Sequence, residues 1–284
     1  MFKRVLLALD SSPAAWELFN IIPDLRIMGM NELVILHVVN IELLQGRSLE
    51  RYRENYLKIL QGKLEALEGK GIHVKLVMPF GHPSELVALV ADEEDVDLIL
   101  IGSIGESSLR EFLLGSTVAD VIRRSNRPVM VEKYISLGEK TQFIPSYTQK
   151  WASVLLPTDF TEASERIYKE FLKVAEHLYR IILLHVVDKR FTKKERRDKE
   201  DKAYSYLEEW QVKFKEKNAN VDFKIVLGAP AKKIAEVADS EGATLIALPA
   251  QESGISTPLI GRTADSLLKL SGSPLLLFKG HVGD

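Results

Sequence analysis

The stretch Asp97-Leu-Ile-Leu-Ile-Gly-Ser-Ile-Gly105, followed by Gly115-Ser-Thr117, decides how this chain folds. Its apolar run predicts a buried strand, and the residues after Gly115 have apolar side chains at helical spacing. Glycine at the exit of a strand lets the backbone approach a ligand closely. A Gly-Ser-Thr helix start offers unpaired N–H groups, hydroxyls and the positive end of the helix dipole. The pattern therefore predicts a phosphate-binding site.

The composition is that of a globular protein and excludes several functions. A chain of 284 residues, 46% hydrophobic and 27% charged, is long enough for about two domains. The net charge of −2 predicts no attraction to nucleic acid or to an anionic membrane. The absence of cysteine excludes disulfides and thiolate chemistry. No apolar run approaches the ~18 residues of a membrane helix, and the first residues lack a signal-peptide pattern. We therefore expect a cytoplasmic protein.

Five segments of the first half recur in the second half at an offset of 146 to 149 residues. The matched pairs are residues 5–10 with 154–159, 33–39 with 181–187, 81–83 with 228–230, 97–101 with 243–247, and 127–131 with 273–277. A register kept through five separate matches indicates a tandem duplication. We expect domains at 1–135 and 151–284, with 136–150 as the linker.

Each half alternates apolar strands with amphipathic helices. Near-continuous Val, Ile and Leu runs predict strands that are covered on both faces, and the alternation predicts a parallel sheet with right-handed crossovers. We expect helices near 13–28, 49–69, 83–93, 116–125, 203–217 and 231–240, an irregular segment at 134–150 and a solvated charged loop at 188–202. A doubly wound sheet binds its ligand beyond the carboxyl ends of its strands, where Asp10, Gly81 and Gly102 are expected.

With the spacing G-x2-G-x9-G-[ST] in place, the chain resembles the universal stress proteins in their tandem two-domain form. The residues that carry the resemblance are Gly102, Gly105, Gly115 and Ser116, supported by the strand segments of both halves. It implies an α/β fold of two tandem doubly wound five-stranded parallel-sheet domains, of the adenine nucleotide alpha hydrolase-like type. It also implies an intramolecular pseudo-dimer, paired through the fifth strands at 128–132 and 274–278.

The resemblance further implies an adenine-nucleotide site in the first half. The first strand would end beside the adenosine, the second beside adenine, and the glycines and the helix start would bind ribose and phosphates. The implied binding residues are Ala8, Leu9, Asp10, Val38, Gly102, Ser103, Gly105, Gly115, Ser116 and Thr117. The ligand would be ATP, ADP or AMP, with Mg²⁺ accompanying ATP.

The second half departs from this motif. Counting back from Gly261, Leu248 and Gln251 stand where the first half has Gly102 and Gly105. Their side chains would occupy space that the first half leaves for ribose and phosphate, so we do not expect a triphosphate site here. The residues that would form a second-half site are Pro157, Asp159, Val186, Gly261, Arg262 and Thr263.

No catalytic machinery accompanies the motif. The chain lacks a P-loop lysine and a nucleophile elbow, and no His, Asp or Glu cluster has metal-ligand spacing. His37 and His185 occupy matching strand positions, which marks them as features of the fold. We therefore expect no catalytic residue and no resident metal.

Three functions remain compatible with these residues. The favoured one is a stress-response module, in which ATP or AMP in the first half sets a conformation that an unidentified protein partner recognises. The alternatives are a slow Mg²⁺-dependent ATPase at the same site and a nucleotide-independent interaction scaffold. The resemblance also implies a homodimer in which each chain is itself a pseudo-dimer.

Overall fold

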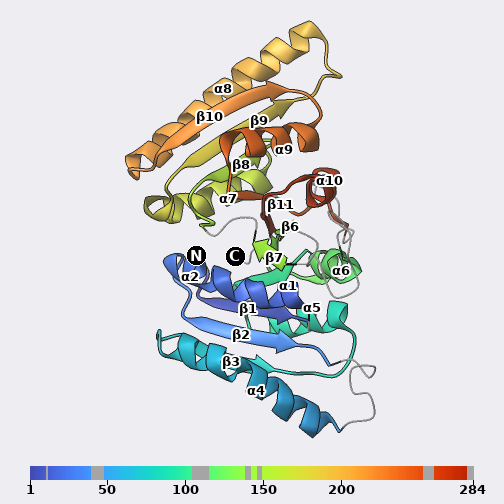
Figure 1. Ribbon diagram of the computed structural model, residues 1–284. Coiled ribbons are helices and arrows are strands. Elements are labelled where there is room, and N and C mark those ends of the chain that lie inside the picture. The colour runs from blue at the N-terminus through green and yellow to red at the C-terminus, as the bar shows by residue number, and fades with distance from the viewer. Residues whose placement is uncertain are drawn as a thin grey trace.

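Ten strands of both halves form one continuous sheet in the computed structural model (Figure 1). The structure describes residues 1–10, 12–39, 48–103, 115–137, 142–145, 149–251 and 259–279, without the side chains of 135–137 and 142–145. The strand order is β10-β9-β8-β11-β12-β5-β4-β1-β2-β3. Each half therefore contributes five strands in the same order, as the sequence predicts.

The elements alternate as the repeat indicates. The first half contains β1 (Arg4–Leu9), α1 (Pro13–Glu17), η1 (Leu18–Ile21), α2 (Ile22–Ile27), β2 (Glu32–His37), α4 (Leu49–Glu68), β3 (His73–Val77), α5 (Pro83–Glu93), β4 (Leu98–Gly102), α6 (Ser116–Arg124) and β5 (Val129–Glu132). The second half contains β8 (Val154–Thr158), α7 (Glu162–Lys173), η2 (Ala175–His177), β9 (Ile181–Val187), α8 (Lys193–Glu216), β10 (Val221–Leu227), α9 (Pro230–Glu241), β11 (Leu245–Pro249), α10 (Arg262–Leu270) and β12 (Leu275–Phe278).

The two faces of the sheet are separate apolar cores, each shared by both halves. One core packs the sheet against α1, α2, α4, α7 and α8, and the other packs it against α5, α6, α9 and α10. Because both faces are covered, the strands are apolar at nearly every position, as in parallel sheets generally. We call these the α4/α8 face and the α6/α10 face.

The halves join through their fifth strands. β12 pairs with β5 in the antiparallel direction, with Leu276 opposite Met130, whereas the pairs within each half are parallel. This confirms the predicted intramolecular pseudo-dimer. The pairing also gives each fifth strand a neighbour on both sides, which removes two exposed edges.

A buried ion pair lies close to this joint. Lys150 Nζ donates to Glu132 Oε1 at 2.7 Å, and both side chains are fully buried. Asp24 Oδ2 accepts the Lys150 backbone N–H at 2.8 Å, and the Trp151 indole N–H donates to the Asp24 carbonyl. These bonds tie α2 of the first half to the chain that enters the second half.

The helix expected at 13–28 is present over residues 13–27, but a 3-10 turn, η1, separates α1 from α2 just before Pro23, which has no N–H to continue an α-helical ladder. Two local predictions were wrong. The segment 134–150 is not irregular, since β6 (Tyr134–Leu137) and β7 (Gln142–Pro145) form an antiparallel hairpin within it. The charged segment 188–202 is not a loop, because α8 begins at Lys193, where Thr192 and Glu195 form a capping box.

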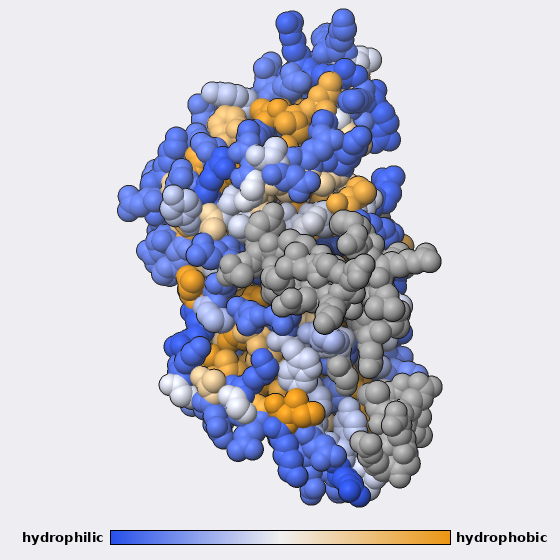
Figure 2. All heavy atoms as spheres, in the orientation of Figure 1, coloured by the Kyte–Doolittle hydropathy of each residue, from blue (hydrophilic) through white to orange (hydrophobic). Residues whose placement is uncertain are grey.

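The surface in Figure 2 is mainly hydrophilic, with hydrophobic residues in separate patches. Exposed large apolar side chains are spread over the chain: Ile59 lies in α4, Leu89 in α5, and Tyr179 in the connection between η2 and β9. Scattered exposure of this kind is ordinary for a globular surface. Across the described ranges, no helix has both the length and the apolar character to cross a membrane.

Candidate functional site

The residues predicted for the first-half site converge at the carboxyl edge of the sheet. β1 ends at Leu9, β2 at His37 and β4 at Gly102, and these strands are neighbours in the sheet. Ala8 and Val38 both pack on the α6/α10 face. Leu9 is buried in the opposite core, so its side chain cannot share a site with Ala8 and Val38. Gly105 lies outside the described residues.

Asp10 and Asp159 fix the chain where each first strand ends. Asp10 Oδ1 accepts the Ser12 backbone N–H at 2.9 Å and also the Ser12 hydroxyl, and Ser12 is the N-cap of α1. Asp159 Oδ1 likewise accepts from the Thr161 N–H and hydroxyl, at 3.1 and 2.6 Å. Each aspartate therefore supports an N-cap residue of the next helix instead of capping the helix itself.

His37 and His185 make the same bond in the two halves. Nδ1 of His37 lies 3.0 Å from the Leu9 carbonyl, and Nδ1 of His185 lies 2.9 Å from the Thr158 carbonyl. A carbonyl only accepts, so Nδ1 carries the proton in both rings. Burial lowers the pKa of both histidines, which keeps them neutral. Each imidazole ties the end of the second strand to the end of the first.

The last helix of each half begins directly against the end of the fourth strand. The Gly115 N–H donates to the Ser103 carbonyl at 3.2 Å, and the Gly261 N–H donates to the Ala250 carbonyl at 2.8 Å. Gly115 and Gly261 are the N-caps of α6 and α10, and neither helix has a side-chain cap. Both helices therefore start at the carboxyl edge of the sheet, where the N–H groups of a first helical turn can bind an anion.

The structure corrects the matching of the two glycine segments by one residue. The Ser103 N–H donates to the Glu132 carbonyl, and the Ala250 N–H donates to the equivalent carbonyl of Phe278. Gly102 pairs with Glu132, and Pro249 pairs with Phe278. Pro249, and not Leu248, therefore stands in the place of Gly102. The prediction failed because the connection to the last helix is one residue shorter in the second half.

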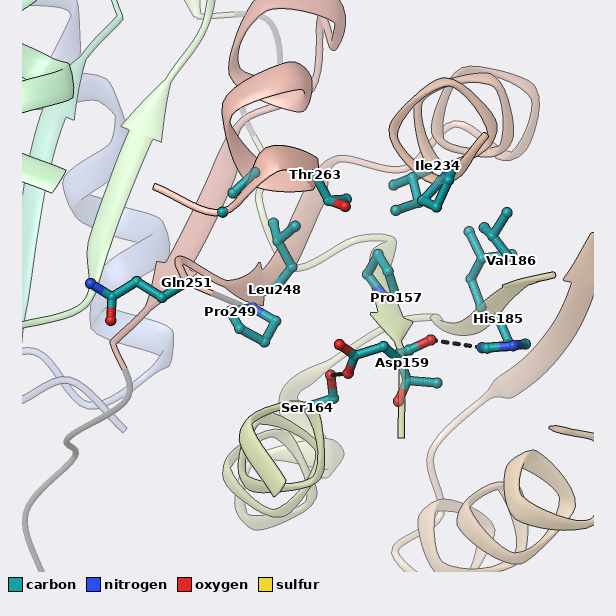
Figure 3. Close-up of a pocket in the computed structure, with 15 residues that line it drawn as sticks. Pro157, Asp159, Ser164, His185, Val186, Ile234, Leu248, Pro249, Gln251 and Thr263 are labelled. Carbon is teal, nitrogen blue, oxygen red and sulfur yellow. Dashed lines mark hydrogen bonds between the residues drawn. The ribbon is translucent and has the colours of Figure 1, made fainter. Parts of the chain in front are cut away.

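A pocket of about 150 Å³ opens at the carboxyl edge of the second half, on the α6/α10 face (Figure 3). Figure 3 shows Val186 beside Ile234 on one side of the pocket, with Leu248 and Thr263 on another. The lining residues are Pro157, Thr158, Asp159, Ser164, Leu184, His185, Val186, Pro230, Ile234, Leu248, Pro249, Gln251, Gly261, Thr263 and Ala264. This volume resembles that of a cavity that holds one benzene-sized ring.

Asp159, Ser164 and His185 lie at one end of the pocket, whereas Thr263 and Gln251 lie apart from them (Figure 3). Ser164 donates its hydroxyl to Asp159 at 2.7 Å, and the His185 ring stacks on Phe160 at 4.3 Å. Five of the six predicted second-half residues line the pocket, but Arg262 does not: it is exposed at the first position of α10. Sequence reasoning missed Ile234 and Pro230, although the match of 228–230 with 81–83 marked the start of their helix.

Comparison with known proteins decides the family. The model of the universal stress protein family matches residues 1–133 and 150–279. The chain belongs to the universal stress protein family. It is 33% identical over 156 residues to the universal stress protein MJ0577 of Methanocaldococcus jannaschii, covering 47% of this chain and 96% of that one.

Two solved structures of universal stress proteins are similar to this one. One, from Archaeoglobus fulgidus, has a TM-score of 0.67 at 21% identity and covers 97% of this chain and 96% of its own. That likeness concerns the fold of the whole tandem chain. Another was solved in complex with cAMP; it has a TM-score of 0.36 at 22% identity and covers 45% of this chain and 97% of its own.

In this universal stress protein, the described residues form no group of three or more His, Cys, Asp or Glu side chains that could hold a metal ion. Each half has one candidate site. In the first half, α6 begins at the N-cap Gly115, beside Gly102 at the end of β4. In the second half, a small pocket lies at the end of β11, where Pro249 takes the place of Gly102.

Proposed function

We propose that this universal stress protein is a nucleotide-binding regulatory module of the cytoplasm. The first half binds one adenine nucleotide (ATP, ADP or AMP, with Mg²⁺ accompanying ATP), and a protein partner recognises the loaded form. Two such chains associate as a homodimer.

The observation that carries this proposal is the start of α6. Gly115 provides no side chain to cap the helix, and its own N–H is fixed on the Ser103 carbonyl. The backbone N–H groups that follow belong to the first turn of α6, beside the end of β4, and Ser116 and Thr117 add hydroxyl groups to that turn. Phosphate is stabilised there by hydrogen bonds and by the helix dipole.

The chemistry of the base end supports an adenine ring. Ala8 and Val38 form an apolar surface on the α6/α10 face, at the ends of adjacent strands. Asp10 directly follows β1, two residues after Ala8, and its carboxylate, which accepts from Ser12 through Oδ1, would also accept hydrogen bonds from a ribose. An apolar surface with a few fixed polar groups is the usual composition of a ligand site.

The second half supports a smaller ligand at most. Pro249 replaces Gly102, and Leu248 is buried at the wall of the pocket. A volume of about 150 Å³ suits one ring system, whereas sites for larger ligands measure roughly 300–1,000 Å³. The proposal therefore assigns the nucleotide mainly to the first half.

The first experiment is to denature protein purified without added nucleotide, identify what is released, and titrate the emptied protein with ATP, ADP, AMP and cAMP. One adenine nucleotide per chain is expected. No release and no binding would contradict the proposal and leave an interaction scaffold. Mg²⁺-dependent release of ADP from added ATP would show an ATPase at this site instead.

A matched pair of variants assigns the site to a half. Thr117→Asp places a carboxylate where phosphate would bind, and a helix start tolerates aspartate, so binding should be lost while the protein stays folded. Thr263→Asp makes the equivalent change on α10. Loss of the nucleotide through Thr263→Asp, with retention through Thr117→Asp, would overturn the assignment to the first half.

A further inference from the structure

The first glycine of the motif lies against a tyrosine from the hairpin. A Cβ atom placed on Gly102 would lie 2.6 Å from the Tyr134 hydroxyl oxygen and 3.0 Å from its Cε2. Real Cβ atoms essentially never approach another heavy atom to less than 3.0 Å, so a Cβ at position 102 would force the Tyr134 side chain to move. Tyr134 is the first residue of β6, two residues beyond the end of β5. The absence of a side chain at position 102 is therefore used by the protein itself.

The tyrosine lies on the face opposite to the predicted ligand. Side chains alternate along a strand, and Leu98 and Leu100 of β4 belong to the α4/α8 core. Gly102 thus faces the same side, and Tyr134 packs against that same core. The second-half pocket, and the Ala8 and Val38 surface, lie on the α6/α10 face. A side chain at position 102 would meet Tyr134 before it met a ligand.

The two halves differ in residue size at the positions of Gly102 and Tyr134. Pro249 stands in the place of Gly102. The offset of 146 residues that relates Lys133 to Lys279 puts Gly280 in the place of Tyr134; Gly280 lies outside the described residues, so this match rests on the sequence. By this sequence match, the Gly102–Tyr134 contact of the first half corresponds to the residue types proline and glycine in the second half.

A short path of contacts joins Tyr134 to the start of α6. Gly102 precedes Ser103, whose N–H donates to the Glu132 carbonyl at 2.8 Å, and whose carbonyl accepts the Gly115 N–H. Gly115 is the N-cap of α6. A displacement of Gly102 would therefore shift the helix start that is proposed to bind phosphate.

We propose that Tyr134 is a positioning residue for the first-half site, and that it is this tyrosine, and not the bound nucleotide, that requires glycine at position 102. The inference rests on the proposed function for its link to binding. Tyr134 holds the end of β4, and with it Ser103 and the N-cap of α6, in the geometry that receives phosphate.

The surroundings of the hydroxyl fit this role. Burial raises the pKa of Tyr134 well above its ordinary value, and the carboxylates of Glu132, Asp10 and Glu17 raise it further. The hydroxyl therefore stays protonated, and the ring packs as a neutral group. The Asp10 carboxylate, which contributes to this pKa shift, directly follows β1. Tyr134 therefore lies near the end of β1 as well as the end of β4.

The test is a double-variant cycle of Gly102→Ala and Tyr134→Ala, with the melting temperature and AMP affinity measured for each protein. In the unmodified background, Gly102→Ala should lower the melting temperature and weaken AMP binding by at least about tenfold, equivalent to ~1.4 kcal/mol. In the Tyr134→Ala background, where the added Cβ has room, Gly102→Ala should change neither quantity further. Gly272→Ala, whose Cβ would meet nothing within 4 Å, should leave both at the unmodified values.

The outcomes separate this inference from the proposed function. Equal losses from Gly102→Ala in both backgrounds would mean that the ligand or another neighbour requires the glycine, and would overturn the inference. If the unmodified protein binds no nucleotide, the proposed function fails, and the cycle in melting temperature still decides whether Tyr134 imposes the glycine. If Gly102→Ala alone does not fold, a folded double variant supports the inference and an unfolded one overturns it.

Discussion

At the scale of single residues, matching positions in the two halves keep their bonds while their neighbours change. His37 accepts from the Tyr52 hydroxyl at Nε2, 2.9 Å away, and stacks on Tyr56 at 4.0 Å. His185 stacks on Phe160 instead. The bond from Nδ1 to the carbonyl of the first strand is common to both. The duplicated bond holds the strand ends together, and the variable neighbours shape each site.

The Glu132–Lys150 pair yields the first stability prediction. Burial raises the pKa of Glu132 to about 7 and lowers that of Lys150, while the attraction between the two opposes both shifts. Glu132→Gln leaves the Lys150 ammonium buried without a carboxylate, which should lower the free energy of unfolding by about 3–5 kcal/mol. Urea denaturation at pH 7 measures the change.

The matched comparison uses a double variant and an exposed pair. Glu132→Gln with Lys150→Met removes both charges and should recover most of the loss, because uncharged replacements of buried pairs are often neutral. The exposed pair Lys213–Glu209 should show a coupling of at most about 0.5 kcal/mol in the same type of cycle. A coupling this small for Glu132 and Lys150 would contradict the prediction.

At the scale of elements, α8 shows how local hydrogen bonds start a helix in a charged segment. The Thr192 N–H donates to Glu195 Oε2 at 2.7 Å, and the Glu195 N–H donates to Thr192 Oγ1. Lys199 Nζ lies 4.3 Å from the centre of the Phe191 ring, and Arg196 donates to the Lys189 carbonyl. These contacts lie within one segment of chain and stabilise the first turns of α8 without a core.

The capping box gives the second prediction. Thr192→Ala removes the hydroxyl that caps α8 and should lower the free energy of unfolding by about 1 kcal/mol. Ser205→Ala is the control within the same helix, since its exposed hydroxyl donates to the Asp201 carbonyl within α8, and should change stability by less than about 0.5 kcal/mol. Equal effects of the two substitutions, measured by chemical denaturation, would argue against the cap.

At the scale of the whole molecule, two buried lysines link the halves reciprocally. Lys133, which follows β5, donates to the Leu268 carbonyl in α10 of the other half. Lys279, which follows β12, donates to the Arg123 carbonyl in α6 at 3.4 Å. Each ammonium meets the carboxyl end of the other half's last helix, where the helix dipole favours positive charge. The symmetry of the joint thus extends beyond the paired strands.

These lysines predict how stability depends on pH. Burial lowers the pKa of both amines from 10.5 to about 8. Between these values the unfolded chain binds more protons than the folded chain, so the free energy of unfolding should rise with pH, by at most about 1.4 kcal/mol per pH unit for each lysine. Urea denaturation from pH 7.5 to 9.5 measures this slope.

The double variant Lys133→Met with Lys279→Met isolates the contribution of the lysines. It should show a smaller rise of stability with pH than the unmodified protein. Lys232→Met, an exposed lysine, is the control and should leave the slope unchanged. A double variant with the same slope as the unmodified protein would contradict the proposed titration.

Much of the fold follows from the sequence alone. The repeated strands and helices predict two equivalent parallel sheets, because burial of both faces leaves apolar runs that are visible in the chain. The start of α8 was missed because its capping box lies in a segment where charge dominates the composition. Of the predicted nucleotide residues that the structure describes, most lie where three strands end, although Leu9 points into the opposite core; nucleotide binding stays a prediction.

The sequence by itself determined the duplication, the doubly wound architecture and the glycine segment before α6, because each depends on spacing or on hydrophobic pattern. The joint at the fifth strands was implied by the resemblance to a known family and not by the pattern of residues. Only the tertiary structure decided that Pro249 replaces Gly102, that Tyr134 fills the space beside that glycine, and which helix receives Lys133. These features depend on hydrogen-bond register and on contacts between segments that are distant in sequence. Spacing along the chain reports neither, because a one-residue change in a loop leaves the hydrophobic pattern intact.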